Sequence, residues 1–509
     1  MATGGSSDSS DSSDSSGIKR LIDLSSNFLD TFERGLFVGY ERAGGDIVTL
    51  LDLTPRDFQD NEMFPLSAEK TWWLPRNQKL NPFSVSIQEF PFRGPTAFGQ
   101  RFSFDVKSVG CGDLLTNTVL QIELGHWFDD TTLLRLESGK YQITTDFWAY
   151  ANSLGSVIVE KAELEIGDST IETIDGDFLN VFYNLQDLNS QYGIGQDGLG
   201  TTSPTQTRPF PTQDRTLYIP LPFFFARIKL KEALPLLACR EGSVRIHVTL
   251  RPFHECLQII GSSRASKIDT PLGLDTTVMN YMNSVQLSAF VTAQATIPQF
   301  KTIKLVTQAA NTDGDIRQKI LRNPFEILRR DVSTFYFEEP LKYAINKSSS
   351  DTITVQLPLE VNHPMEEFMW FIRRKGTALQ SEWTNYSSVL NSDMDPVFNP
   401  RAPLLKSASI QFNGVEIVNA NEQFFRSHLA KKHNDASTAY KNYIYGYSFA
   451  TAPGQHQPSG TLNASRLQTI RLTLNIAALP QDTWEIKVFV TTLQWLRFQN
   501  GMANPMFQN

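Results

Sequence analysis

The chain lacks the residues and segments that mark several large classes of protein. It has only three cysteines in 509 residues, Cys111, Cys239 and Cys256, which are far apart and without CxxC spacing. Neither a disulfide framework nor a zinc site is therefore indicated, and a reducing compartment is favoured. No run approaches the roughly 20 apolar residues that a membrane-spanning helix needs, and the first residues lack the basic and apolar regions of a signal peptide. We therefore expect a soluble protein that is made inside the cell.

Positive charge is also scarce. Lys and Arg number 46 against 54 Asp and Glu, which gives a net charge of −8. A protein that neutralises nucleic-acid phosphates over a broad surface is therefore not expected. Phenylalanine is abundant, with 35 residues against 14 Tyr and 8 Trp, and it suits the inner faces of stacked sheets. The length is sufficient for two to four domains.

The sequence contains the first residues of several binding and catalytic motifs, but each motif lacks residues that its function requires. Residues 193–198 match GxGxxG, but a Thr/Pro tract follows instead of the helix that a dinucleotide site requires, so we expect a loop. His254 and Glu255 start like a metalloprotease helix, yet the second His is missing. No nucleophile elbow or phosphate-binding loop is present.

Two acidic clusters also fall short of a metal site. Residues 313–315 resemble the start of a calcium loop but lack the remaining ligands. His126 with Asp129 and Asp130 has no third cluster to complete a ligand set. We therefore expect no catalytic, cofactor-binding or metal-binding residues, no cofactor and no enzymatic activity.

One pattern occurs twice in the chain. Residues 161–172 read KAELEIGDSTIE and residues 406–417 read KSASIQFNGVEI. In each copy, apolar and polar residues alternate on both sides of a turn, which is typical of a β-hairpin. The Asn413-Gly414 turn is the stronger signal, because both residue types tolerate a positive φ. Each hairpin leads into an acidic-to-aromatic stretch, DGDFLNVF in the first copy and NEQFF in the second.

Most of the remaining chain reads as short strands separated by Pro, Gly and Asn. Strands are expected at 102–106, 118–124, 217–225, 244–250, 285–292, 352–359, 367–373, 405–412, 443–450, 469–476 and 484–496. Helical signals are weak, and the best lies at 421–433. The order hairpin, short helix, strand, loop, strand recurs in both halves. We predict an all-β protein with two jelly rolls and few short helices.

Composition divides the chain into four regions. Residues 1–17 repeat Ser and Asp and predict a disordered tail. Residues 18–98 begin with an amphipathic helix over 18–33, which either packs on its own domain or docks on a partner or membrane surface, and continue as an extended arm. The two rolls are expected at 99–283 and 284–509. Polar insertions near 191–213 and 311–323 are candidate outward loops, and 261–277 is a loop or linker.

Several segments resemble the major capsid proteins of nucleocytoplasmic large DNA viruses. In the first half they are AELEIGDSTIE, LYIPLPFFF and ALPLLACREGSVRIHVTL, and in the second half LLKSASIQFNGVEI, YGYSF and QPSGTLNASR. The QPSGTLNASR stretch is the most specific, because it is long and precedes a strand. AFGQ at 97–100 and EFMWFIRRKGTALQSEWTNY at 367–386 resemble the iridovirus branch and its relatives.

The resemblance implies a double jelly roll, with two eight-stranded sandwiches in one subunit, and a homotrimer. Two similar rolls per chain around a three-fold axis give six nearly equivalent wedges, so the block has a hexagonal outline and can tile an icosahedral shell. The implied location is the virion capsid, assembled in the host cytoplasm. The implied partners are neighbouring capsomers, minor capsid proteins and an inner membrane, without direct contact to nucleic acid.

Two other functions are compatible with the sequence. One is a scaffolding protein of the same fold, present only during assembly and absent from mature particles. The other is a carbohydrate-binding β-sandwich, which would need an aromatic platform or a pair of carboxylates about 5–10 Å apart that the sequence does not locate. The Asn-x-Ser/Thr triplets at Asn346, Asn385 and Asn463 are expected to be chance matches without a secretory route.

Overall fold

Strand pairing in the computed structural model of the chain builds two sandwiches. The structure describes residues 62, 81–125, 148–151, 153–186, 215–227, 232–259, 300–339, 351–379, 381–389, 400–479 and 482–507. The features expected at 1–17, 18–33, 191–213, 261–277 and 285–292 lie outside these residues, as do His126, Asp129, Asp130 and Asn346. The chain divides into two compact units, 1–81 and 82–509, and all the elements named below lie in the second unit.

The first sandwich consists of two antiparallel sheets with the strand orders β1-β11-β3-β7 and β2-β9-β5-β6. Its strands are β1 (Phe83–Pro91), β2 (Arg101–Val106), β3 (Leu114–Leu124), β5 (Val159–Ile166), β6 (Ser169–Asp175), β7 (Arg215–Pro220), β9 (Val244–Leu250) and β11 (Phe300–Thr312). Three short strands add to these: β4 (Trp148–Tyr150), which pairs with β10 (Leu257–Ile259), and β8 (Leu234–Pro235), which extends the β3 edge. The helical segments are α4 (Ser108–Cys111), α6 (Leu154–Ile158), α7 (Gly176–Gln186), η1 (Phe224–Ala226), η2 (Leu236–Ala238) and η3 (Phe253–Glu255).

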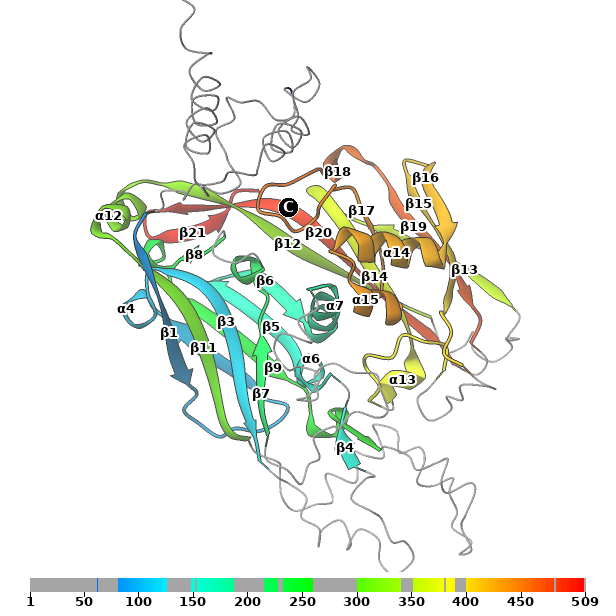
Figure 1. Cartoon of the computed structure of the whole chain (residues 1–509), viewed down its shortest axis with the longest axis horizontal. Coiled ribbons are helices and arrows are strands. Elements are labelled where there is room, and N and C mark those ends of the chain that lie inside the picture. Colours follow the sequence, from blue (N-terminus) through cyan, green and yellow to red (C-terminus); the bar gives the residue numbers. More distant parts are fainter. Residues whose placement is uncertain are drawn as a thin grey trace, which may run out of the picture. The chain divides into compact units, whose positions relative to one another are not determined.

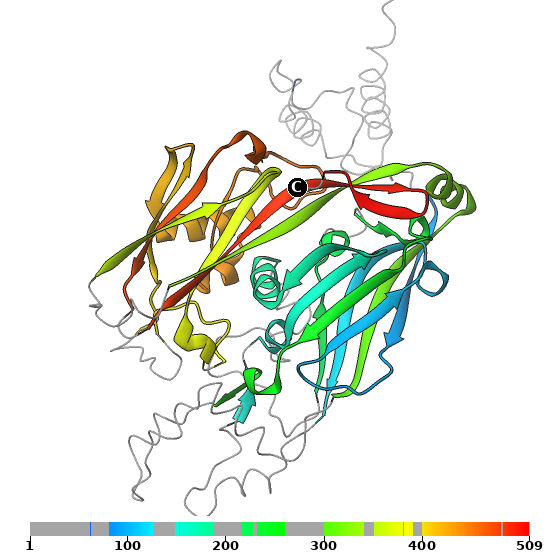
Figure 2. The same ribbon diagram turned by 180° about the vertical axis from the view of Figure 1, so that it is seen from behind.

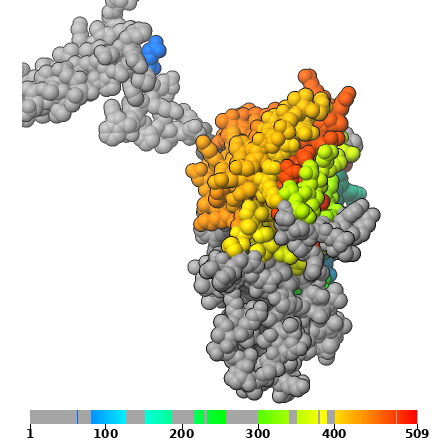
Figure 3. All heavy atoms as spheres, turned by 90° about the vertical axis from the view of Figure 1, so that its right-hand side faces the viewer, coloured from blue at the N-terminus to red at the C-terminus, as the bar shows by residue number. Residues whose placement is uncertain are grey.

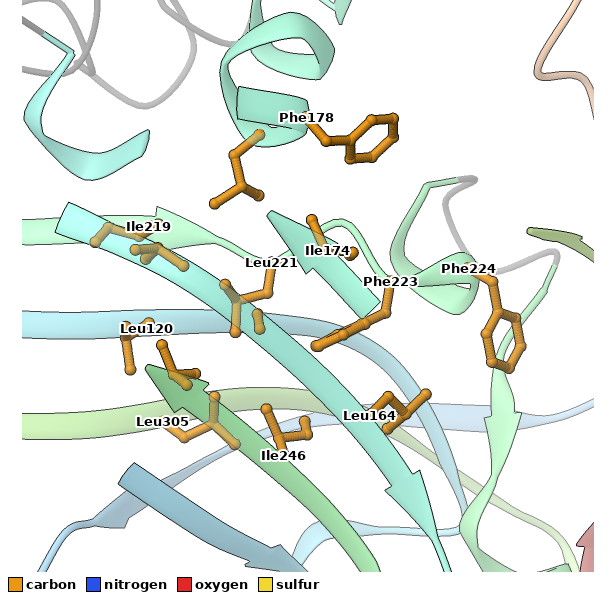
Figure 4. Packing of buried hydrophobic residues seen from close by; sticks show 14 of the residues in the cluster. Leu120, Leu164, Ile174, Phe178, Ile219, Leu221, Phe223, Phe224, Ile246 and Leu305 are labelled. Carbon is orange, nitrogen blue, oxygen red and sulfur yellow. The ribbon is translucent and has the colours of Figure 1, made fainter. Parts of the chain in front are cut away.

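The core of the first sandwich lies between its two sheets. In β2, Phe102, Phe104 and Val106 are buried while the residues between them are exposed, as the alternation in the sequence predicts. The buried residues shown in Figure 4 come from both sheets, from α7 and from the segment after β7: Leu120, Leu164, Ile174, Phe178, Ile219, Leu221, Phe223, Phe224, Ile246 and Leu305.

The second sandwich has sheets with the orders β12-β20-β14-β17 and β13-β19-β15-β16. Its strands are β12 (Phe325–Glu338), β13 (Thr352–Leu359), β14 (Pro364–Arg374), β15 (Leu405–Phe412), β16 (Val415–Asn421), β17 (Tyr445–Ser448), β19 (Ile470–Ala477) and β20 (Trp484–Gln499). Short strands β18 (Leu462–Asn463) and β21 (Met502–Pro505) pair with β14 and β20. The helical segments are α13 (Lys375–Leu379), α14 (Glu422–Lys432), α15 (Ser437–Lys441) and η5 (Ala464–Arg466).

Both sandwiches are jelly rolls of the same topology. If the eight main strands of each are lettered B to I in chain order, both have one sheet of order B-I-D-G and one of order C-H-E-F. Figures 1 and 2 show the first roll in blue to green and the second in yellow-green to red. The predicted all-β double jelly roll with few short helices is confirmed.

The duplicated hairpin is also confirmed. Strands β5 and β6 pair in the first roll, and β15 and β16 pair in the second. Asn413 and Gly414 have φ of 51° and 83°, the left-handed values that an Asn-Gly hairpin turn requires. Both hairpins have a register shift at the same place, directly after Leu164 in the first and after Ile410 in the second. The repeat therefore extends to an irregularity that sequence periodicity does not show.

Two local expectations are wrong. The strand expected at 217–225 ends at Pro220, because Pro220 and Pro222 have no N–H to donate to a neighbouring strand, and a 3-10 turn follows. The outward loop expected at 311–323 is instead the end of β11 and the helix α12 (Gly314–Arg322). The side chain of Asp313 caps this helix by accepting a hydrogen bond from the Gly314 N–H at 2.7 Å.

The boundaries of the first roll also differ from those expected. The arm over 18–98 contains β1, which pairs along its whole length with β11. In turn β11 pairs with β3 of the first roll, although it was expected in the second. The physical reason is that the first strand (B) and the last strand (I) of a jelly roll pair with each other. This pairing joins segments that are distant in the sequence, so local patterns do not show it. Helix α12 then connects the two rolls.

Candidate functional site: the seam between the two rolls

Helix α7 of the first roll is buried against the second roll. It follows β6, and the Asp175 side chain caps it by accepting a hydrogen bond from the Phe178 N–H at 2.7 Å. Nearly all of its side chains are buried. Phe178 meets Phe489 of β20 edge to face, with ring centroids 5.5 Å apart. Figures 1 and 2 both show α7 between the sheets of the first roll and the β12-β20-β14-β17 sheet. We call this contact the seam.

Gly176, the first residue of α7, lies in close contact with backbone atoms of neighbouring segments. A Cβ on Gly176 would lie 2.2 Å from the carbonyl oxygen of Val159 and 2.3 Å from that of Ser156. Both are backbone atoms that cannot move aside, so only glycine permits α7 to begin this close to α6 and β5. The position of the helix in the seam is therefore fixed from the first roll.

A cluster of buried charges joins α7 to the second roll. Arg373 of β14 donates to Asp177 through Nη1, with a distance of 2.8 Å to Oδ1, and also to Glu485 of β20 through Nε. Lys487 of β20 donates to Asp175 at 2.9 Å and also to Asp177. All five side chains are at least three-quarters buried. The two strands and the helix cap are thus held in one hydrogen-bonded network.

The charges in this cluster stabilise one another. Burial alone would raise the pKa of Asp177, but the positive charges of Arg373 and Lys487 more than offset it and hold the pKa below its ordinary value. Burial would lower the pKa of Lys487, and the negative charges of Asp177 and Asp175 raise it instead. Asp177 and Lys487 therefore each favour the charged form of the other, as a paired buried network requires.

A second buried cluster lies where β12 enters the second roll. Arg330 donates through Nε to Glu366 of β14 at 2.7 Å and through Nη1 to Glu232 of the first roll at 3.0 Å. Arg227 of the first roll donates to Glu172 of β6 and, at 2.8 Å, to the carbonyl oxygen of Arg330. This chain of contacts runs from β6 through Arg227 and Arg330 to β14, and so it crosses the seam a second time.

The carboxylates of the second cluster are less well compensated than Asp177. Burial raises the pKa of Glu232 to about 7 despite the opposing charges of Arg330 and Arg227. Its Oε2 is buried without a hydrogen-bond partner. Burial likewise raises the pKa of Glu366 and of Glu172. A cavity of about 940 Å³ lies beside Glu232, and His363, His456 and Trp495 are among its other lining residues.

Aromatic residues complete the seam. The Tyr386 ring stacks on Phe371 of β14, with centroids 4.2 Å apart, and its hydroxyl accepts a hydrogen bond from Asn180 of α7 at 2.8 Å. The Trp383 indole N–H donates to the carbonyl oxygen of Glu255 at 3.0 Å. These residues belong to the EWTNY segment of the second roll, which therefore has a structural role in attaching the two rolls.

Three of the possible ligands or catalysts suggested by the sequence lie in the described part of the chain, and each belongs to a local turn or helix cap. His254 and Glu255 lie in the 3-10 turn η3, and Asp313 is a helix cap. Within the described part of the chain, no three His, Cys, Asp or Glu side chains are grouped to hold a metal ion. The three cysteines are buried and unpaired, and burial raises their pKa values, for Cys239 to about 12. No helix among the described residues is long and apolar enough to cross a membrane.

Sequence reasoning did not identify the seam, although one signal was present. The run MEEFMWFIRR in β14 places two acidic and two basic residues in a strand that is otherwise apolar. Charged residues are rarely buried unless they are paired, so this run indicates partners elsewhere in the fold. Its partners Asp177, Glu485 and Arg330 are distant in the sequence and become neighbours only in the folded chain.

Two jelly rolls of one topology, joined by a buried charged seam, define a double jelly-roll protein. Two family models match: "Major capsid protein N-terminus" over residues 71–289 and "Large eukaryotic DNA virus major capsid protein" over residues 328–504. The chain therefore belongs to the major capsid protein family of nucleocytoplasmic large DNA viruses, whose members are structural components of the virion and not enzymes. This membership replaces the carbohydrate-binding alternative.

Individual relatives agree with the family models. The chain is 25% identical to the major capsid protein of Pyramimonas orientalis virus over 451 residues, covering 84% of this chain and 91% of the relative. It is 23% identical to that of Paramecium bursaria Chlorella virus 1, covering 78% and 80%. Among solved structures, VP54 of PBCV-1 has a TM-score of 0.62 at 18% identity, covering 86% of this chain and all of that one. The Faustovirus major capsid protein has a TM-score of 0.60 at 12% identity, covering 87% and 94%.

Proposed function

We propose that this major capsid protein works as a homotrimer, in which six jelly rolls form a pseudo-hexagonal capsomer of an icosahedral shell. The observation that carries the proposal is the seam. One roll attaches to the next through α7, which covers the outer face of a B-I-D-G sheet. Both rolls have this sheet and both have a helix after the F strand. The same junction can therefore be repeated from one chain to the next.

The contact is head to tail, because a helix on one roll meets a sheet on the other. Head-to-tail contacts generate rings when the rotation closes. With two rolls per chain, three chains give a ring of six rolls, and closed symmetry leaves no free end. The partners proposed for such a ring are neighbouring capsomers, minor capsid proteins and an inner membrane beneath the shell.

Mass measurement tests the trimer directly. The full chain, purified without denaturant, is passed through a sizing column with light scattering at several concentrations. We expect a species of three times the 57.4 kDa chain mass. A chain that stays monomeric at the highest concentration contradicts the proposal.

Protein content of purified virions tests the role in the shell. A shell subunit is the most abundant protein of mature particles, whereas a scaffolding protein of the same fold is present only in assembly intermediates. Quantitative mass spectrometry of both fractions distinguishes these outcomes. Absence from mature particles would contradict the proposed role while leaving the fold and the trimer intact.

A further inference from the structure

Helix α14 of the second roll corresponds to α7 of the first. Each follows the F strand, and each is capped by the last residue of that strand. Asn421 accepts a hydrogen bond from the Phe424 N–H at 3.0 Å, as Asp175 does from the Phe178 N–H at 2.7 Å. Phe424 therefore occupies the position of Phe178. Phe178 is only 4% exposed, whereas Phe424 is 42% exposed.

The residue that receives Phe178 also has a counterpart. Phe178 packs on Phe489, which lies on the outer side of β20, the I strand of the second roll. Both D strands carry a bulge, at Thr116 in β3 and at Glu366 in β14, where they pair with the I strand. Aligning the bulges makes Val306 of β11 the counterpart of Phe489. Val306 pairs with positions on β1 and β3 in the middle of the first roll's B-I-D-G sheet.

The outer face of that sheet carries a row of large apolar side chains beside the Lys304–Glu89 ion pair. Phe83, Val85 and Ile87 alternate along β1 with exposed fractions of 49%, 44% and 66%, and Tyr218 on β7 is 45% exposed. Val306 lies between them and is half-buried. Soluble proteins seldom leave such a row of large apolar side chains uncovered.

The outer face of the other sheet of the first roll is polar by contrast. Arg101 pairs there with Glu163 at 3.0 Å, and Arg245 pairs with Asp105 at 3.2 Å and with Glu165 at 3.1 Å. These ion pairs suit contact with water. Of the two described outer faces of the first roll, the B-I-D-G face carries the row of exposed large apolar side chains, and it corresponds to the face covered by α7 in the second roll.

We propose that α14 of one subunit covers the β1-β11-β3-β7 face of the next subunit in the ring, with Phe424 packed on Val306 and next to Ile87. The inference rests on the proposed homotrimer and specifies which surfaces form it. Each subunit contributes α14 at one end and the apolar sheet face at the other. The interface between chains thus repeats the geometry of the seam within a chain.

The charges of the seam are not repeated at this interface. The counterparts of Asp175 and Asp177 are the neutral residues Asn421 and Gln423, following the shared cap position. Lys304, the counterpart of Lys487, already pairs with Glu89 of its own subunit at 3.0 Å. Charges that are solvated on the free subunit lose that hydration when an interface covers them, so neutral residues at these positions lower the desolvation cost of assembly. This difference fits a contact that forms after folding.

Cross-linking tests the pairing of surfaces. We would combine Phe424→Cys with Val306→Cys in the full chain and treat the native oligomer with a short bis-maleimide. Background reaction should be small, because Cys111, Cys239 and Cys256 are buried. We expect cross-linked products that end at three chains, and no product from either single variant. A product from Phe424→Cys alone would show a helix-to-helix contact and overturn the inference.

A surface substitution with a matched control gives an independent test. Ile87→Asp should raise the monomer fraction roughly tenfold or more at equal protein concentration, because it places a charge in the proposed interface. Val415→Asp is the control, since Val415 is 62% exposed on β16, outside the proposed interface, and it should stay oligomeric. Circular dichroism and the urea midpoint verify that both variants fold.

The outcomes separate the two proposals. A wild-type chain that never forms trimers refutes the homotrimer and with it this inference. A wild-type trimer in which the double-cysteine variant gives no cross-link, or in which Ile87→Asp assembles normally, refutes only the assignment of the surfaces.

Discussion

Removing Arg373 should destabilise the protein more than any other single change in the seam. Its side chain is 3% exposed, and it pairs with Asp177 and Glu485, which are 5% and 9% exposed. Arg373→Met keeps most of the volume but removes the ion pair of the buried Glu485 and leaves the buried Asp177 with Lys487 as its ion-pair partner. Breaking a buried ion pair by removing one partner costs about 3–5 kcal/mol. We expect a loss in this range in the free energy of unfolding.

Neutralising the whole group should restore much of the loss. In the triple variant Arg373→Met, Asp177→Asn, Glu485→Gln no carboxylate is stranded, and Lys487 keeps Asp175 at 2.9 Å. Replacing a complete buried ion network by neutral residues is often close to neutral in stability. The triple variant should therefore be about 2 kcal/mol or more stable than Arg373→Met alone.

Urea unfolding followed by tryptophan fluorescence measures these differences, with all variants at one protein concentration because assembly adds to apparent stability. Acid gives a second readout. Since the pKa of Asp177 is lowered in the folded chain, its contribution is present above about pH 4 and is lost as the pH falls through the folded value. The difference between wild type and Asp177→Asn should thus shrink in acid. Additive losses in the triple variant, within about 0.5 kcal/mol, would refute the network.

Two further predictions concern the same region. Burial raises the pKa of Glu232 to about 7, so its contribution to stability is fully present below about pH 4.5 and is lost as the pH rises through 7. Between pH 5 and 8, the free energy of unfolding of the wild type should therefore fall by on the order of 2–3 kcal/mol relative to that of Glu232→Gln. Equal pH profiles in urea melts would contradict this. Gly176→Ala should cost about 2 kcal/mol or more, since its Cβ would meet backbone oxygens at 2.2 and 2.3 Å, whereas Gly314→Ala, with no atom within 4 Å, should be neutral or slightly stabilising. Similar thermal midpoints for the two glycine variants would show that α7 can shift.

Local patterns in the sequence predict much of the fold. The period-two alternation of 102–106 and the Asn413-Gly414 turn locate a strand and a hairpin directly, because both depend on neighbouring residues. The pairing of β1 with β11 is different, since their partners are more than 200 residues apart. No local signal specifies such a register, so local patterns do not locate the boundary between the rolls.

The seam was beyond local reasoning for the same cause. Arg373 and Arg374 are consecutive, yet alternation along β14 sends them to opposite faces, one to Asp177 in the seam and the other to Asp482 at 3.0 Å. The sequence reveals the charges but not their partners. Arg373 is buried because α7 packs against the second roll, where Phe178 contacts Phe489. The sequence around Arg373 contains no sign of this contact.

The contrast between the two kinds of junction has a physical basis. Within a chain, α12 tethers the rolls, so the effective concentration of one roll at the other is high and a costly buried ion network can form during folding. Between chains, each surface must first remain soluble alone, and any charge that the contact covers loses its hydration when assembly occurs. On this face Lys304 already pairs with Glu89 of its own subunit. Association then depends on apolar area, which needs no exact charge register. The duplicated roll thus provides the same helix-on-sheet contact within a chain and between chains. Buried ion pairs stabilise the contact within the chain, and apolar side chains form the proposed contact between chains.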